Sequence, residues 1–143
     1  MKFLALDVGE KRVGIATSDP LGVGVWPQKT FYRQGIDQDF EKLAELIEEQ
    51  APQALVVGLP LNMNESEGPQ AKKVRQFIEK LQIQMKQRNL TLPVYWQDER
   101  LTSWAAEEKL VEKGIRGKKK KEEVDSMAAC LILEDYLRSK GKL

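Results

Sequence analysis

Residues 3–18 read FLALDVGEKRVGIATS, and this stretch decides the fold. Residues 3–6 are continuously apolar, as expected of a central strand that is buried on both faces of a sheet. A tight turn is predicted over residues 7–11, and the chain then returns as a second strand over residues 13–18. A third strand is predicted over residues 25–33, where aromatic and β-branched side chains are frequent. The short connections between these strands predict an antiparallel meander.

After the meander the apolar residues recur at helical spacing, interrupted by short apolar runs typical of buried strands. The order βββαβαβαα with right-handed crossovers predicts an α/β fold. We expect a five-stranded mixed sheet, with the meander and two parallel strands, and helices on both faces. At 143 residues the chain is expected to form one domain spanning residues 1–143. The predicted later elements are a helix capped by Asp37 or Asp39 and ended by Pro52, a strand over residues 54–59, a helix starting at Pro69, a strand over residues 92–97, a helix from Thr102 or Ser103 to residue 113, and a last helix over residues 122–138.

The composition excludes several kinds of active site. The chain has no histidine, which rules out Ser-His-Asp and Cys-His catalysis and argues against a zinc site. Cys130 is the only cysteine, so no intrachain disulfide can form and a reducing compartment is expected. The apolar run at residues 3–6 is too short for a signal peptide or a membrane span, so we expect a cytoplasmic protein with no membrane partner. Acid–base chemistry must therefore come from carboxylates, lysines or metal-bound water.

Three acidic residues lie where their side chains could meet. Asp7 follows the first apolar run, Glu99 follows the strand over residues 92–97 with Asp98 beside it, and Asp125 opens the last helix. Open α/β sheets bind ligands at the carboxyl ends of their strands, so one shared edge is expected for the three. Carboxylates gathered there repel one another unless a cation joins them, and hard oxygen ligands suit Mg²⁺ or Mn²⁺. We predict a metal site made of Asp7, Glu99 and Asp125, with Asp98 as a further candidate ligand.

Each acid by itself has an ordinary explanation. An aspartate such as Asp7 is common in a solvated hairpin turn. Acids such as Glu99 and Asp125 are common near helix N-termini, where the helix dipole favours them. The prediction of a shared site therefore depends on the three acids taken together.

Basic and amide side chains surround the predicted site. Arg12 and Arg100 could bind a phosphate bidentately, and Asn62 lies in a loop directly after a predicted strand, where substrates often bind. Residues 109–121 contain six lysines and one arginine against a single acid. Four of these lysines are consecutive and are predicted to form a mobile loop that holds a nucleic-acid backbone, although such a run can also be a solvated tract. The predicted substrate contacts are Arg12, Asn62, Arg100, Lys118, Lys119, Lys120 and Lys121.

Four motifs follow one another along nearly the whole chain. They are Asp7-x-Gly9-x-x-Arg12-x-Gly14-x-Ala16, then Val57-Gly58-Leu59-Pro60 with Asn62, then Asp98-Glu99-Arg100-Leu101-Thr102, and finally Asp125-x-x-Ala128-Ala129 with Ile132-Leu133. Together they closely resemble the YqgF (RuvX) family of bacterial ribonuclease-H-like proteins. That family has been described as Holliday junction resolvases and is linked to maturation of the 5′ end of pre-16S ribosomal RNA.

The resemblance implies a ribonuclease-H-like fold and a metal-dependent nuclease with Asp7, Glu99 and Asp125 as its acidic site. It implies two-metal hydrolysis with Mg²⁺ or Mn²⁺, and a structured RNA, the rRNA precursor, as the partner. One departure is visible: Glu65 stands where such proteins often carry a glycine. Its negative charge puts substrate contact by the loop after Asn62 in question.

Three other functions are compatible with the same residues. A DNA junction resolvase needs two symmetric active sites and therefore a dimer, and the sequence leaves the oligomeric state open. A noncatalytic nucleic-acid-binding module could use the lysines while its acids are vestigial. Asp7-x-Gly9 also occurs in phosphate-binding folds of the actin and sugar-kinase type, but these need two such domains and this chain is short for that.

Overall fold

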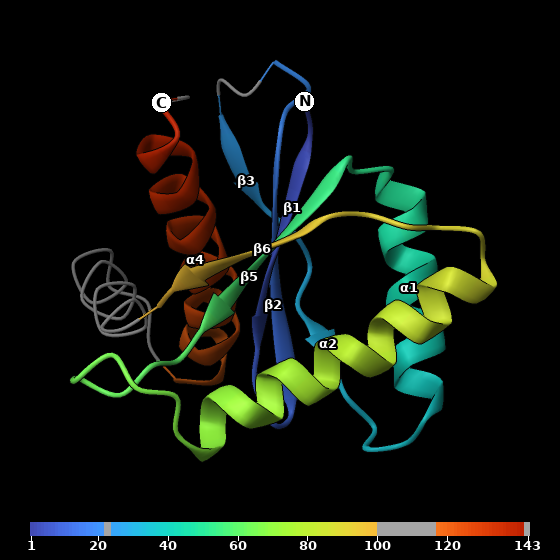
Figure 1. Cartoon of the computed structure of the whole chain (residues 1–143), viewed down its shortest axis with the longest axis horizontal. Coiled ribbons are helices and arrows are strands. Elements are labelled where there is room, and N and C mark those ends of the chain that lie inside the picture. Colours follow the sequence, from blue (N-terminus) through green and yellow to red (C-terminus); the bar gives the residue numbers. More distant parts are fainter. Residues whose placement is uncertain (22–23, 100–116, 142–143) are drawn as a thin grey trace.

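The computed structural model describes residues 1–21, 24–99 and 117–141, and for residues 117–125 it describes only the course of the helix backbone. In the described part, strands alternate with helices after an initial run of strands (Figure 1). The elements are β1 (Phe3–Val8), β2 (Arg12–Ser18), β3 (Val25–Pro27), β4 (Phe31–Tyr32), α1 (Gln38–Gln50), β5 (Ala54–Leu59), α2 (Pro69–Gln87), β6 (Val94–Asp98) and α4 (Gly117–Ser139).

The strands form one mixed sheet in the order β3-β2-β1-β5-β6, and β4 also pairs with β2. β1 is antiparallel to β2 and parallel to β5, and β5 is parallel to β6. The predicted mixed sheet is therefore confirmed, with β1 at its centre. The carboxyl ends of β1, β5 and β6 lie at the same edge because these three strands are parallel.

The prediction of one continuous strand over residues 25–33 was wrong. Two short strands, β3 and β4, pair with successive parts of β2, which gives the sheet six strands instead of five. The interruption follows Pro27, which has no N–H to donate to a ladder. The carbonyl of Gln28 instead accepts a hydrogen bond of 3.0 Å from the hydroxyl of Ser126 in α4. The N–H of Gln28 still donates a hydrogen bond of 2.8 Å to the carbonyl of Ile15 in β2, so the segment between β3 and β4 is bonded both to the sheet and to the helix that covers it.

Helices cover both faces of the sheet, as predicted (Figure 1). Alternate residues of β1 supply the two cores: Leu4 and Leu6 pack in the cluster that includes α1 and α2, whereas Phe3 and Ala5 pack in the cluster that includes α4. Asp7 continues the second series, so strand alternation places it on the α4 face of the sheet.

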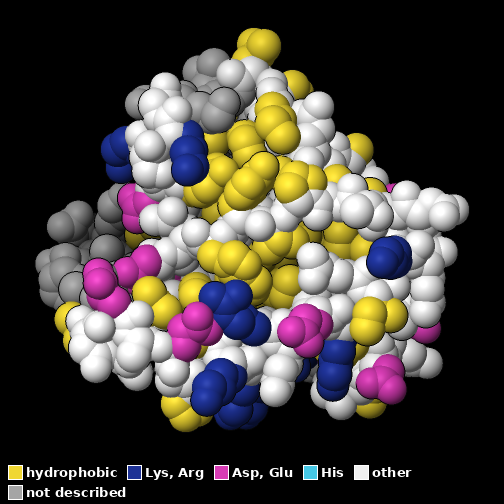
Figure 2. Space-filling view, in the orientation of Figure 1, with side chains coloured by type: hydrophobic (Ala, Val, Ile, Leu, Met, Phe, Trp, Pro, Cys, Tyr) yellow, Lys and Arg dark blue, Asp and Glu magenta, His cyan; other side chains and the backbone are white. Residues whose placement is uncertain are grey.

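Figure 2 shows hydrophobic side chains gathered over the middle of one face, with basic and acidic side chains along α2.

The prediction of a loop at Lys118–Lys121 was also wrong. Helix α4 begins at Gly117, so the backbone of all four lysines is helical. Lysine is a good helix former, and a run of like charge is not by itself enough to end a helix. The helix predicted from Thr102 or Ser103 to residue 113 lies outside the described residues. None of the described helices is both long and apolar enough to cross a membrane.

Candidate active site

Asp7 and Glu99 meet at the carboxyl edge of the parallel strands. Asp7 lies near the end of β1, opposite Gly14 of β2. Glu99 directly follows β6, and its backbone N–H donates a hydrogen bond of 3.2 Å to the carbonyl of Leu59 at the end of β5. The side chains of Asp7 and Glu99 are hydrogen-bonded to each other. Such a bond between two carboxyl groups needs a proton on one of them.

The environment of Glu99 favours its protonated form. Burial makes the largest contribution, followed by the negative charge of Asp7, the hydrogen bond to Asp7 and the charge of Asp98, and together they raise the pKa of Glu99 to about 10. Two carboxyl groups this close cannot both ionise unless positive charge is added. A divalent cation would replace the shared proton, so the chemistry of this pair fits a metal site.

The raised pKa gives a prediction for the metal-free protein. Between the ordinary pKa of 4.5 and the folded-state value of about 10, the folded chain binds a proton that the unfolded chain has lost. Stability should therefore fall as the pH rises through this range. Glu99→Gln removes the titrating group, so we expect the variant to gain melting temperature relative to the unmodified protein, by more at pH 8 than at pH 5. Thermal unfolding in EDTA measures this difference. Parallel pH curves for the two proteins would contradict it, and Glu41→Gln, an exposed acid of α1, is the control.

Gly58 of β5 makes room for the Glu99 carboxyl group. A Cβ atom at this position would lie 2.7 Å from Oε2 of Glu99 and 2.5 Å from Cδ1 of Ile132 in α4. Both distances are too short for any side chain larger than a hydrogen, so the carboxyl group lies directly on the strand backbone. This role was not predicted from the sequence, where Gly58 was placed in a strand and in one of the four family motifs. A glycine inside a strand is itself a signal of close approach by another group.

Asp125 lies in α4, but its side chain is among those that the structure does not describe. The next residue, Ser126, is buried, and its hydroxyl lies 3.1 Å from that of Thr30. Ala128 and Ala129 are fully buried. The helix just after Asp125 is therefore fixed against the sheet. Among the side chains that the structure describes, no three acids, cysteines or histidines are grouped closely enough to hold a metal ion.

Asp98 lies on the other side of β6 from the acidic pair. It pairs with Leu59 at the end of the strand, two residues beyond Trp96. Trp96 packs against the core shared with α2, where the guanidinium of Arg75 lies 4.6 Å from its ring centroid. Strand alternation therefore directs Asp98 toward α2. Its charge acts on Glu99, but its position does not favour a shared ion.

Among the predicted substrate residues whose side chains the structure describes, Arg12 lies on the same face of the sheet as Asp7. It is half-buried at the start of β2, where it lines a hollow of about 220 Å³ at the β1–β2 turn. Val13 and Ile15 of the same strand pack in the α1 and α2 core, so alternation places Arg12 on the α4 face with Asp7. Arg100 and the side chains of the lysine run lie outside the described residues.

Asn62 organises its own loop. Its side-chain amide donates a hydrogen bond of 3.0 Å to the hydroxyl of Ser66, and its backbone N–H donates one of 2.8 Å to the carbonyl of the same residue. Glu65 in this loop has a φ of 69°, in the left-handed region that favours glycine. This conformation explains why a glycine suits the position that Glu65 occupies here.

Comparisons with known proteins agree with this geometry. Residues 1–139 match the family described as "RuvX: Holliday junction resolvase". A protein of Desulforamulus reducens named "Putative pre-16S rRNA nuclease" is 39% identical over 142 residues, which cover 99% of this chain and 100% of the relative. A protein of Syntrophomonas wolfei with the same name is 42% identical over 137 residues, which cover 96% of this chain and 94% of the relative.

Two solved structures share the fold at low sequence identity. The RuvC protein of Thermus thermophilus in complex with a Holliday junction substrate aligns with a TM-score of 0.57 at 14% identity, covering 99% of this chain and 97% of that one. The fowlpox virus resolvase in complex with Holliday junction DNA aligns with a TM-score of 0.56 at 13% identity, covering 98% of this chain and 99% of that one. These likenesses confirm a ribonuclease-H-like fold, and the match over residues 1–139 shows that the chain belongs to the RuvX family.

Proposed function

We propose that this protein is a metal-dependent nuclease that hydrolyses phosphodiester bonds in the 5′-end processing of pre-16S ribosomal RNA in the cytoplasm. The observation that carries the proposal is the buried, hydrogen-bonded pair of Asp7 and Glu99 at the carboxyl edge of the sheet. Burial of two carboxyl groups against each other is costly without a cation, and active sites are where such arrangements concentrate. The names of the relatives support the rRNA precursor as substrate.

The proposed ligands of the metal are Asp7, Glu99 and Asp125. Asp125 completes the set because it precedes the segment of α4 that Ser126 fixes to the sheet. We propose Mg²⁺ or Mn²⁺, and two ions in the working enzyme. When bound, the ions would supply a Lewis acid for the scissile phosphate and a water of lowered pKa.

The chain's own residues prepare this site in three ways. The Leu59 carbonyl holds the backbone of Glu99, and Gly58 lets its carboxyl group lie against β5, so the ligand is oriented before metal arrives. Asp7 is held in the central strand, which fixes its distance from Glu99. Arg12 supplies a positive charge at the same end of the sheet, where it would hold the phosphate to be cut.

A direct comparison of substrates tests the proposed function. The purified protein is incubated with an RNA that carries the 5′ leader of 16S rRNA and, separately, with four-way junction DNA, each with Mg²⁺, Mn²⁺ or EDTA. We expect metal-dependent cleavage of the RNA and none of the junction. Cleavage of the junction alone would replace the proposal with a resolvase. Binding without cleavage of either would replace it with a noncatalytic binding module.

The lysine run gives a further prediction for this substrate. Replacing Lys118, Lys119, Lys120 and Lys121 with alanine should preserve α4, because alanine is the best helix former. RNA binding should weaken, and the salt slope should fall by about one unit for each phosphate that the variant no longer binds. Saturating RNA should largely restore the rate, because charges away from the reacting phosphate contribute mostly uniform binding.

Fluorescence anisotropy over a series of salt concentrations measures the change. The control replaces three exposed lysines of α1 and α2, which are Lys42, Lys72 and Lys86. If affinity and salt slope of the four-lysine variant both match the unmodified protein, the run is a solvated tract.

A further inference from the structure

A second cavity lies beside the β1–β2 turn, between the turn and α2. Its volume is about 320 Å³, at the lower end of the range for ligand pockets. Val8 and Gly9 form one wall, directly after Asp7 in the chain, and Phe77 of α2 lies on the other side. Val8 alternates with Asp7 along β1, so this pocket opens on the α1 and α2 face, away from the acidic pair.

The lining of the pocket is positively charged. Arg33, Lys73 and Lys80 all line it, and Glu10 is the only acid among the described lining residues. Lys73 and Glu10 form an ion pair of 3.2 Å with side chains that are 63% and 70% exposed, so solvent screens it. Three cations and one acid line the pocket, so its net charge is positive and it favours an anionic ligand.

Arg33 is held rigidly in the wall of this pocket. Its Nη1 donates a hydrogen bond of 2.6 Å to the carbonyl of Gly9, and its guanidinium lies 4.7 Å from the ring centroid of Phe77. Its Nε is buried and has no hydrogen-bond partner among the described residues. The Gly9 carbonyl and the Phe77 ring thus fix the guanidinium in the pocket wall, and its positive charge acts on any anion held in the pocket.

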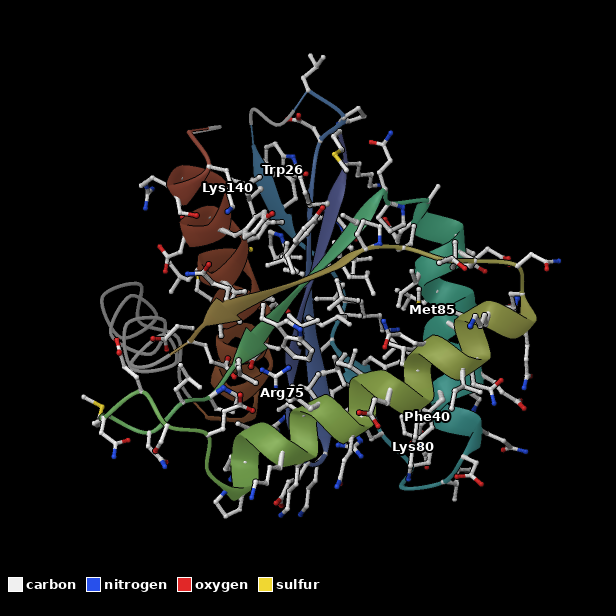
Figure 3. The ribbon with its side chains drawn as sticks, viewed as in Figure 1. Trp26, Phe40, Arg75, Lys80, Met85 and Lys140 are labelled. Carbon is white, nitrogen blue, oxygen red and sulfur yellow. The ribbon has the colours of Figure 1, made fainter. Side chains whose placement is uncertain are left out.

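Two aromatic rings, those of Phe40 and Phe77, also line the pocket. The rings of Phe40 and Phe77 lie 4.9 Å apart between centroids, and the ammonium of Lys80 lies 5.9 Å from the Phe40 ring. Figure 3 shows Phe40 and Lys80 side by side where α1 and α2 approach each other. These apolar rings lower the local dielectric and strengthen the attraction of the cations for an anion.

The hollow at the β1–β2 turn adjoins this pocket. The hollow that Arg12 lines also includes Gly9, Glu10 and Lys11, so it shares two residues with the larger pocket. Gly9 lets the turn close tightly, with its N–H 2.8 Å from the carbonyl of Arg12. The hollow and the pocket are therefore adjacent at the β1–β2 turn, and Glu10 is the only acid among the described residues that line either of them.

We propose that the pocket of Arg33, Lys73 and Lys80 holds a backbone phosphate of the nucleic-acid strand whose neighbouring segment lies at the acidic pair. This inference rests on the proposed function, and it adds a second anchoring point on the opposite face of the sheet. The two points lie on either side of the β1–β2 turn. Binding at the pocket fixes the direction in which the strand crosses the turn, and so which phosphate reaches Asp7.

The test uses the double variant Lys73→Gln/Lys80→Gln in the full chain, with Arg33 left in place because it supports the turn. Binding of a fluorescent single-stranded RNA to metal-free protein is followed by anisotropy at several salt concentrations. We expect affinity to fall about tenfold at 0.1 M salt and the salt slope to fall by about one unit. The matched control is Lys72→Gln/Lys86→Gln, which removes the same charge from the same helix outside the pocket and should change affinity less than about twofold.

Three outcomes would overturn the inference. The first is equal weakening by the two double variants, which would mean that only the overall charge of α2 matters. The second is that the unmodified protein does not bind the RNA at all. The third is that Lys73→Gln/Lys80→Gln loses binding of a mononucleotide but keeps the RNA affinity of the unmodified protein. The pocket would then be a small-molecule site.

Binding and cleavage are measured separately, so the two proposals can fail separately. RNA binding through the pocket without any metal-dependent cleavage would leave this inference standing and overturn the proposed nuclease. Normal cleavage by Lys73→Gln/Lys80→Gln, together with an RNA affinity equal to that of the unmodified protein, would overturn this inference and leave the proposed nuclease standing.

Discussion

Asp7→Asn is expected to abolish metal-dependent cleavage while making the metal-free protein more stable. The substitution removes a metal ligand, and loss of about 4 kcal/mol of transition-state stabilisation corresponds to roughly a thousandfold lower rate. Burial would still raise the pKa of Glu99, but the contribution of the Asp7 charge is removed, so keeping Glu99 in the folded protein costs less. Single-turnover cleavage in Mg²⁺ and thermal unfolding in EDTA measure the two effects on the same preparation.

The opposite directions of these effects make the test specific. A variant that has merely misfolded would lose both activity and stability. Glu41→Gln, which removes an exposed acid of α1, should leave both unchanged. A variant at Asp7 that cuts RNA at a substantial rate with the original metal dependence would count against the acidic pair as the catalytic centre.

Gly58→Ala is expected to damage the site through Glu99. The new methyl group would lie 2.7 Å from Oε2 of Glu99 and 2.5 Å from Cδ1 of Ile132, so both side chains must move. Overpacking of this kind costs roughly 1–3 kcal/mol of stability. Displacement of a ligand by its supporting residue typically lowers metal affinity or activity by about 10–100-fold. Mn²⁺ binding followed by electron paramagnetic resonance, together with the cleavage rate, measures the loss.

A second variant separates the two contacts of Gly58. Ile132→Val removes Cδ1, so Gly58→Ala/Ile132→Val relieves the overlap with the helix and leaves the overlap with the carboxyl group. We expect it to recover part of the stability that Gly58→Ala loses but none of the metal affinity. Recovery of metal affinity along with stability would mean that Gly58 acts through the packing of α4 and does not orient Glu99.

The central part of the fold could be predicted because apolar patterning determines it. The run over residues 3–6 predicted a central buried strand, and the structure confirms β1 in that place. The errors arose where contacts distant in sequence decide the outcome. The segment between β3 and β4 is held by Ser126, about a hundred residues later in the chain, whose hydroxyl bonds to the carbonyl of Gln28. Local sequence gives no sign of such a bond.

The closeness of Asp7 and Glu99 could be predicted from the sequence, whereas the place of Asp125 beside them stays a prediction. The end of β1 and the end of β6 indicated Asp7 and Glu99, because strand ends are visible in the sequence. The shared proton and the raised pKa of Glu99 could not be foreseen, since they depend on burial and on the distance between the two groups. The role of Gly58 depends on how close the Glu99 carboxyl group comes to β5, which the spacing of residues does not reveal.

The position of the bound metal tests the proposed active site most directly. Crystals of the protein soaked in Mn²⁺ and measured at the manganese absorption edge give an anomalous difference map that marks each ion without assumptions about its ligands. We predict a peak bonded to carboxylate oxygens of Asp7 and Glu99 at about 2.1 Å, with Asp125 as the third protein ligand. A peak elsewhere, or the absence of any peak between Asp7 and Glu99 in a protein that cleaves RNA with Mn²⁺, would contradict this assignment.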